Sequence, residues 1–307
     1  MKKHKLHYIW QYYLRSWAKQ EKKVHKIWAM VNDKIIFTNM ENVAQERDFY
    51  QIRDLNIQDI DLIDNLILKK MSNELRKNNQ TWVNLFNFIV NFRNQAMQNG
   101  ITQELQEEFD NLIYNFEEEV QCEIEMNSKS YLDKIKSGDV SFYENEDDNI
   151  NFNYFLSVQY FRTCKLKNSI SDIKHPNINI DRIWNIAAHI FAINMGYKMN
   201  EEKGVLHCVI MKNNTEQFLI TGDQPVVNTF SSYKDDKEQL SHEQFELYYP
   251  QSPILALLIT KRPEFKDITT IEMETEMVRK YNDIINNASH IQLYSNTKES
   301  LEYYKKN

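Results

Sequence analysis

The scarcity of residues that break regular structure constrains this chain most. Its 307 residues include 5 glycines and 5 prolines, so few positions force a turn and long, uninterrupted elements are favoured. Apolar residues make up 42% of the chain and aromatic residues 12%, which is enough to fill a core of this size. We therefore expect a folded, helix-rich protein.

The scarcity and the scattering of certain residues exclude several kinds of binding site and several classes of protein. The glycines, at positions 100, 138, 196, 204 and 222, never cluster, which excludes a P-loop and a dinucleotide-binding loop. Cys122, Cys164 and Cys208 are far apart and form no CxxC pair, so the sequence indicates neither a zinc site nor a disulfide framework. No segment approaches the ~20 apolar residues that cross a bilayer. We expect a cytoplasmic protein with no metal, no cofactor and no membrane partner.

The charge is distributed unevenly along the chain. The formal net charge is −7, yet the stretch from Lys2 to Lys23 and the end at Lys305 and Lys306 are basic. The field of the whole molecule therefore does not favour nucleic acid, and a polyanion would have to bind a local patch. The aromatic residues of the basic start either stack on bases or are core residues beside lysines whose stems cover them.

Helical periodicity dominates the middle of the chain. Apolar residues recur at helical spacing over 57–92, with a break expected near Asn78 and Asn79, and again over 102–127, 153–167, 180–197 and 271–288. The Gly- and Asp-containing run 137–151 reads as a loop. In the helix over 102–127, Glu117, Glu118, Glu119 and Glu123 read as a solvated face, because no histidine follows any of them by three residues as a carboxylate-bridged dimetal site requires.

Strand signals lie at the two ends of the chain. Residues 23–30 and 34–37 flank the turn signal Asn32-Asp33 and predict a hairpin, and short strands are expected over 205–211, 217–221, 245–249, 254–260 and 290–294. The pattern predicts an α+β fold, a helix-rich domain with a small mixed or antiparallel sheet built from the N-terminal hairpin and the C-terminal strands. We expect a single domain over 1–307, helical over about 57–197 and sheet-rich over about 205–295.

The stretch from His7 to Trp17 carries the most distinctive side chains. In a helix, His7, Gln11 and Arg15 lie four residues apart on one stripe, and Ile9, Tyr13 and Trp17 form a second stripe. One side would be buried. The other would offer a base, an amide and a guanidinium, either to a polar ligand or only to solvent.

Four short segments, widely separated along the chain, carry its motifs. They are His7-Tyr8-Ile9-Trp10-Gln11-Tyr12-Tyr13-Leu14-Arg15, Gln159-Tyr160-Phe161-Arg162-Thr163, Leu219-Ile220-Thr221-Gly222-Asp223-Gln224-Pro225-Val226 and Tyr249-Pro250-Gln251-Ser252-Pro253. In this order they resemble the His-Tyr-hydrophobic-Pro-Gln-aromatic-Tyr-Leu-Arg, Gln-x-x-Arg-Thr, Thr-Ser-Asp-Asn-Pro-Val and Pro-Leu-Ser-Pro elements of the bacterial family DUF4238. Trp10, Gly222, Gln224 and Gln251 stand where that family has Pro, Ser, Asn and Leu. The resemblance implies one mixed domain and brings no established activity.

These segments contribute chemistry that suits an anionic group. Arg15 and Arg162 are guanidiniums that would clamp a phosphate or carboxylate. His7 would act as acid or base, with Asp223 orienting it. The amides of Gln11 and Gln159 and the ring of Tyr13 would position the substrate. The leading hypothesis is a metal-independent hydrolase or nuclease acting on RNA or a nucleotide, as a bacterial defence effector.

Three alternatives stay open. The same groups would serve a non-catalytic sensor or binding module for a small anionic ligand or a protein partner, and a homo-oligomer is compatible with the sequence. Arg162 and Asp223 would otherwise form only a structural ion pair. Arg182 and His189 are also similar to the Arg-x(4–6)-His pattern of HEPN-type ribonucleases, which requires both side chains to be accessible; a buried core histidine is the competing interpretation.

Overall fold

A computed structural model describes residues 5–171, 179–233 and 244–305 of the chain. The helices in these ranges are α1 (Gln11–Leu14), α2 (Ile57–Leu62), α3 (Asn73–Gln98), α4 (Gln103–Lys136), α5 (Glu146–Phe161), α6 (Cys164–Ser171), α7 (Ile180–Glu201), α8 (Thr275–Ala288) and α9 (Glu299–Glu302). The strands are β1 (Lys5–His7), β2 (Lys19–Glu21), β3 (Val24–Val31), β4 (Lys34–Asn39), β5 (Gln45–Arg47), β6 (His207–Asn213), β7 (Thr221–Gly222), β8 (Val227–Asn228), β9 (Glu246–Ser252), β10 (Leu255–Thr260), β11 (Thr270–Met273) and β12 (Gln292–Ser295). The α+β class expected from the sequence is confirmed.

The strands form three small sheets. One has the order β11-β6-β10-β9-β8, a second has the order β2-β3-β12-β7 with β4 paired to β3, and β1 pairs with β5. The first sheet is mixed, because β11 runs parallel to β6 whereas its other pairs are antiparallel. In the second, C-terminal β12 pairs with N-terminal β3. The two ends of the chain therefore share a sheet, as the strand signals predicted.

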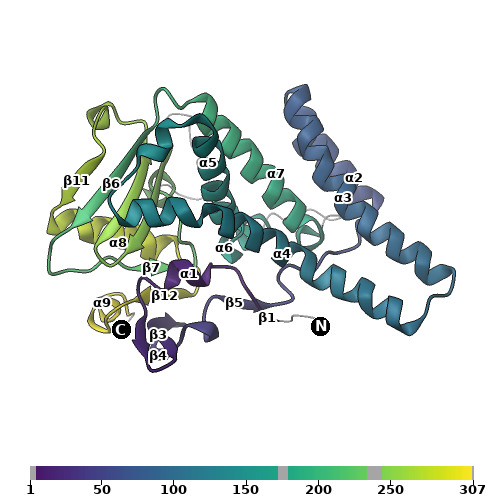
Figure 1. The fold of residues 1–307 in the computed structure, drawn as a ribbon, viewed down its shortest axis with the longest axis horizontal. Helices are drawn as coiled ribbons and strands as arrows, with labels where there is room; N and C mark the ends of the chain where they lie inside the picture. Colours follow the sequence, from purple (N-terminus) through teal and green to yellow (C-terminus); the bar gives the residue numbers. More distant parts are fainter. Residues whose placement is uncertain (1–4, 172–178, 234–243, 306–307) are drawn as a thin grey trace.

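The first sheet is covered on both faces. Its strands alternate between two hydrophobic clusters: Cys208 and Ile210 belong to the cluster that contains residues of α4 and α5, whereas Val209 and Met211 belong to the cluster that contains α8. Strands buried on both faces read as continuous apolar runs. A third cluster joins α3 to α7. Figure 1 shows the sheets at one end of the molecule and the pair α3–α4 extending away from them at the other.

Several boundaries differ from expectation for local reasons. The helical break lies at residues 63–72 and not near Asn78 and Asn79, because Ser72 caps α3 and Asn79 is buried within it. Most of the predicted loop 137–151 is helical, since the side chain of Asn145 caps α5 and its acidic residues occupy the first turn. The strand expected over 217–221 shrinks to β7, and β11 precedes α8 where a single helix was expected.

The opening stretch is only partly helical. His7 ends β1, and α1 is a single turn from Gln11 to Leu14, so His7 does not share a helical stripe with Gln11 and Arg15. The apolar side was predicted correctly: Ile9, Tyr13 and Trp17 are at most 1% exposed. The predicted hairpin is β3–β4, with Asn32 and Asp33 both at positive φ in its turn, as a two-residue hairpin loop requires.

Among the described residues, no helix combines the length and the apolar character needed to cross a membrane.

Candidate functional site

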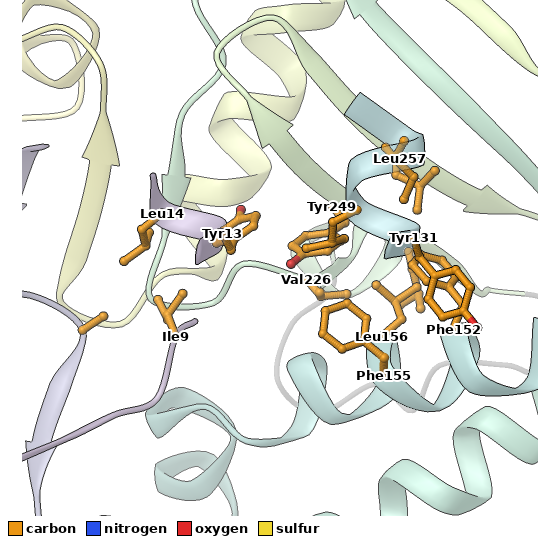
Figure 2. Close-up of a cluster of buried hydrophobic side chains, with 14 of the residues drawn as sticks. Ile9, Tyr13, Leu14, Tyr131, Phe152, Phe155, Leu156, Val226, Tyr249 and Leu257 are labelled. Carbon is orange, nitrogen blue, oxygen red and sulfur yellow. The ribbon is translucent and has the colours of Figure 1, made fainter. Parts of the chain in front are cut away.

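The four motif segments meet in the interior. From the first segment, the hydroxyl of Tyr13 bonds Thr221 Oγ1 at 2.7 Å, and its ring stacks on Tyr249 with centroids 4.9 Å apart. Figure 2 shows these two rings side by side in the core. From the second segment, the hydroxyl of Thr163 bonds the side-chain oxygen of Gln224 in the third. The four segments therefore converge, and they form a packed interior.

Arg162, in the second segment, is buried and makes several polar contacts. It follows the last residue of α5 and is 3% exposed. Its Nη2 donates to Gln159 Oε1 at 2.9 Å and lies 2.5 Å from Glu125 Oε1, and its Nη1 donates to Gln121 Oε1 at 3.2 Å. Gln159 and Arg162, which are three residues apart, are thus in contact. The ion-pair partner of Arg162 is Glu125 on α4 and not Asp223.

The groups around Arg162 carry polar atoms that the fold leaves unpaired. Within the described residues, Arg162 Nε, Gln159 Nε2, the Tyr249 hydroxyl and both amide atoms of Gln251 are buried without a hydrogen-bond partner. We call Gln121, Glu125, Gln159, Arg162, Tyr249 and Gln251 the Arg162 centre. Burial raises the pKa of Tyr249, and the positive charge of Arg162 and the nearby Gln251 amide counteract part of this rise, although no hydrogen bond to Gln251 is completed.

A β-bulge places Gln251 in this centre. In the β9–β10 pair, Leu255 is opposite Ser252 whereas Ala256 is opposite Pro250, so Gln251 is the extra residue. Bulges redirect a side chain and are frequent beside functional sites. Gln251 is fully buried, and an unpaired buried amide costs free energy that a purely structural residue would not impose.

A second buried pair adjoins the Arg162 centre. Gln121 Nε2 donates to Glu117 Oε1 at 2.9 Å, and Glu117 Oε1 lies 2.8 Å from His189 Nε2. The His189 ring stacks on Trp82 with centroids 4.0 Å apart. His189 and Glu117 are each 2% exposed. Glu117 was expected on a solvated face, and this is wrong because it lies on the inner stripe of α4.

The buried position of His189 argues against the HEPN alternative. That alternative required accessible side chains, and His189 is enclosed by Trp82 and Glu117. Arg182, for its part, makes a two-pronged ion pair with fully buried Asp59, at 2.8 and 3.1 Å. Both residues therefore hold helices together.

Asp223 binds backbone N–H groups of residues 290–292 and does not orient His7. It is 1% exposed, and its carboxylate accepts hydrogen bonds from the backbone N–H groups of His290, Ile291 and Gln292 at 2.6, 2.8 and 3.0 Å. Burial raises the pKa of Asp223, and the three N–H groups counteract part of this rise. Asp223 therefore joins β7 to the start of β12.

The remaining candidates lie nearer the surface. The Nε2 atom of His7 is 3.1 Å from the carbonyl oxygen of Glu41, and Gln11 Nε2 donates to the carbonyl of Met40 at 3.3 Å. Arg15 is exposed. The described cavities, of about 440 to 790 Å³, are not lined by His7, Arg15, Arg162 or Asp223. Arg162 and Asp223 are buried whereas Arg15 is exposed, so the four proposed catalytic side chains are not brought together at one open site in the described part of the chain.

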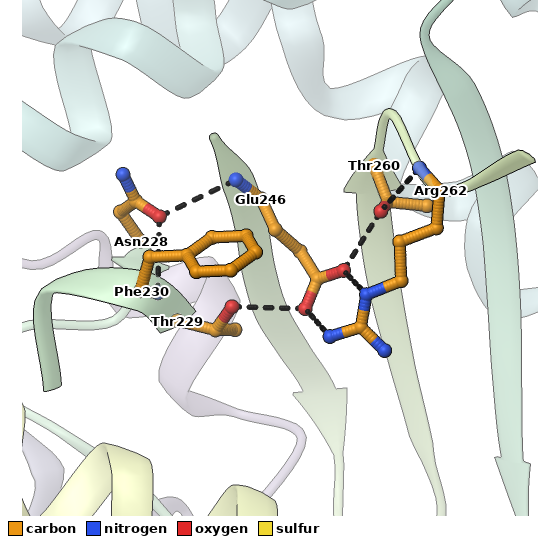
Figure 3. A network of polar contacts seen from close by, with 6 residues as sticks. All are labelled: Asn228, Thr229, Phe230, Glu246, Thr260 and Arg262. Carbon is orange, nitrogen blue, oxygen red and sulfur yellow. Dashed lines mark hydrogen bonds and ion pairs between the residues drawn. The ribbon is translucent and has the colours of Figure 1, made fainter. Parts of the chain in front are cut away.

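Another buried ion pair shows what a completed network looks like. Both oxygens of Glu246 are paired with Arg262, and they also accept hydrogen bonds from Thr229 and Thr260 at 2.8 and 2.7 Å (Figure 3). No polar atom of these four side chains appears among the buried unpaired atoms of the described residues. The Arg162 centre differs because several of its buried donor and acceptor atoms have no hydrogen-bond partner among the described residues.

Sequence reasoning missed Glu125, Gln121, Tyr249 and Gln251 as members of a site. A signal for two of them was present, since Gln121 and Glu125 continue at i+4 spacing the stripe begun by Phe109 and Ile113. Across residues 5–171, 179–233 and 244–305, no group of three or more His, Cys, Asp or Glu side chains is placed to hold a metal ion.

Comparison with known proteins gives a family and nothing more specific. The family model described as "Protein of unknown function (DUF4238)" matches residues 5–181 and 194–299, which includes all four motif segments. No curated protein and no solved structure matches the chain. The chain belongs to the DUF4238 family.

Proposed function

We propose that this protein is a binding module for a small anionic ligand, which it holds at the Arg162 centre. The observation that carries the proposal is the set of buried, unpaired donors from Arg162, Gln159 and Gln251. Oxygen atoms of a phosphate or carboxylate would accept from these N–H groups, and charge-assisted bonds of this kind are the stronger ones. Binding would thus satisfy groups that the fold alone leaves unpaired.

Glu125 gives this site a dependence on pH. Burial raises the pKa of Glu125 above its ordinary value, and the charge of Arg162 limits the rise. Protonation of Glu125 leaves the positive charge of Arg162 uncompensated. We therefore expect an anion to bind more tightly as the pH falls through the raised pKa of Glu125. Because Arg162 is 3% exposed and Gln251 is fully buried, ligand access requires the layers around Arg162 to part, and association should be slow.

A matched pair of tyrosine variants tests the proposal. The Tyr249 hydroxyl has no hydrogen-bond partner among the described residues, whereas the hydroxyl of Tyr13, stacked against it, bonds Thr221. Tyr249→Phe should leave the free protein as stable as before or more stable, whereas Tyr13→Phe should cost about 1 kcal/mol. Gln251→Met should also preserve or raise stability, because it removes an unpaired buried amide.

The effect of these substitutions on ligand binding should be the opposite of their effect on the stability of the free protein. Inorganic phosphate and AMP are the probes, and the rise in melting temperature at increasing concentration is the measurement. The wild type and Tyr13→Phe should both show the rise, and Gln251→Met should lose it. A wild type that responds to neither probe, or a Gln251→Met variant that is destabilised by more than about 1 kcal/mol, contradicts the proposal, the latter because it makes Gln251 structural.

An enzymatic role is our second candidate. It is favoured by the position of His7, which is half-buried at the end of β1 and has one ring nitrogen, Nε2, 3.1 Å from the carbonyl oxygen of Glu41. On this proposal the protein is a hydrolase or nuclease for RNA or a nucleotide in bacterial defence, with His7 as acid or base. A His7→Ala variant that keeps the phosphate response and loses turnover supports it, whereas a wild type without turnover on RNA and AMP leaves only the binding module.

A further inference from the structure

We propose that the N-terminal part of this protein carries a binding surface for single-stranded nucleic acid. The surface consists of Arg15, Lys19, Lys22 and Lys23, which follow α1 and form the β2–β3 hairpin. All four side chains are exposed, and none makes an ion pair with a described residue. This proposal does not depend on the Arg162 centre.

The charge of this segment contrasts with that of the chain. Residues 1–36 contain nine lysines and arginines against the carboxylates of Glu21 and Asp33, although the chain as a whole has a net charge of −7. Glu21 pairs with Lys26, and among the described residues no carboxylate pairs with any of the four cations of the surface. A local excess of unpaired cations on an acidic protein indicates a specific polyanionic partner, since the overall field repels one.

The turn of the hairpin fixes two of these cations. Lys22 adopts a positive φ of 56°, which is unfavourable for a side chain other than Gly, Asn or Asp. Lys22 and Lys23 lie between the last paired residues, Glu21 and Val24, and are exposed at the tip of the hairpin, whereas Lys19 lies on β2 opposite Lys26. A two-stranded hairpin holds cations at fixed spacing along a phosphate backbone.

Two aromatic side chains on the segment that leads into this surface favour nucleic acid over lipid. Trp10 and Tyr12 are half-buried and lie 5.0 Å apart between centroids, and the ammonium groups of Lys129 and Lys136 lie 4.8 and 4.4 Å from the Tyr12 ring centre. Aromatic rings next to cations are the groups on which unpaired bases stack. Residues 19–23 contain no apolar side chain that would insert into a bilayer.

Besides Glu21, the carboxylate of Asp133 must be counted, because it lies at the Tyr12 ring. Asp133 accepts hydrogen bonds from Tyr12 and from Lys129, so it is already neutralised by the cations of α4. Asp133 lowers the positive charge near Tyr12 but does not change the charge at Lys22 and Lys23. The hairpin tip is therefore the part of the surface at which substitution is most informative.

The test uses the full-length protein and a fluorescent oligouridine of about twelve nucleotides, a length within the site sizes of single-strand binders. Fluorescence anisotropy measures affinity between about 50 and 200 mM salt. Four phosphate contacts predict that the logarithm of the association constant falls with the logarithm of salt with a slope of about −3. The double variant Lys22→Glu/Lys23→Glu should bind at least about tenfold more weakly, with the slope reduced by about 1.4.

A matched double reversal controls for net charge. Lys77 on α3 and Lys266 before β11 are also exposed, so Lys77→Glu/Lys266→Glu makes the same change of charge elsewhere and should leave RNA binding within about twofold of the wild type. Equal losses in both double variants overturn the proposal, as does a wild type that does not bind oligouridine. Binding to phosphatidylserine vesicles without binding to oligouridine also overturns it and assigns the surface to a membrane. Circular dichroism verifies that each variant is folded.

Discussion

Replacing Asp223 by alanine should destabilise the protein by about 3 kcal/mol. The carboxylate accepts from three consecutive backbone N–H groups, those of His290, Ile291 and Gln292. Hydrogen bonds to a charged group contribute about 1.5–3 kcal/mol each, so three independent bonds would give about 5–9 kcal/mol. The real loss should be smaller, because His290 and Ile291 are exposed and water can reach their N–H groups in the variant.

Urea denaturation measures this change as a lower free energy of unfolding at an unchanged slope against urea concentration. Asp61→Ala, at an exposed position of α2, is the control and should change the free energy by less than about 0.5 kcal/mol. Asp223→Asn should lie between the two, because its amide oxygen keeps part of the acceptor capacity. A loss below about 1 kcal/mol for Asp223→Ala would refute the conclusion that Asp223 secures β12.

Two further predictions concern other buried positions. Burial raises the pKa of Glu125 above 4.5, so the folded protein keeps this proton at pH values where the unfolded chain has released it. The free energy of unfolding should therefore fall as the pH rises through that window. Urea denaturation from about pH 4 to 7 should show a flatter dependence on pH for Glu125→Gln. A Cβ at Gly222 would overlap the Ser289 hydroxyl and lie 3.1 Å from the carbonyl oxygen of Gln292, so Gly222→Ala should cost about 1–3 kcal/mol, and adding Ser289→Gly should recover part of the lost melting temperature; no loss in the single variant would contradict the contact.

The sequence specified most of the elements, because these depend on local patterns. Helical spacing identified the long helices, and the Asn32-Asp33 signal identified the β3–β4 hairpin. The predicted element boundaries were wrong where a single capping residue or a short strand outweighed the hydrophobic periodicity. Asn145 began α5 inside an expected loop, and β11 formed by pairing with a strand far away along the chain, which no local window contains.

Only two residues of the Arg162 centre, Arg162 and Gln159, were among the candidates named from the sequence. They are in contact, since a separation of three residues on a helix brings two side chains together. The motifs did not reveal that Glu125 would pair with Arg162, or that Asp223 would serve the backbone of residues 290–292. Those partners come from elements far away in the sequence.

By itself, the sequence determined an α+β chain with long helices, a buried aromatic side to its first segment and a basic start on an acidic protein. Only the tertiary structure decided which polar groups are paired. An arginine, a glutamine and an aspartate have the same letters whether they face solvent, a ligand or a carboxylate on another helix, and the free energy of each depends on burial and on partners brought near by folding. Among the described residues, the atoms of the Arg162 centre and the cations of the N-terminal surface that lack a partner therefore became visible only in three dimensions.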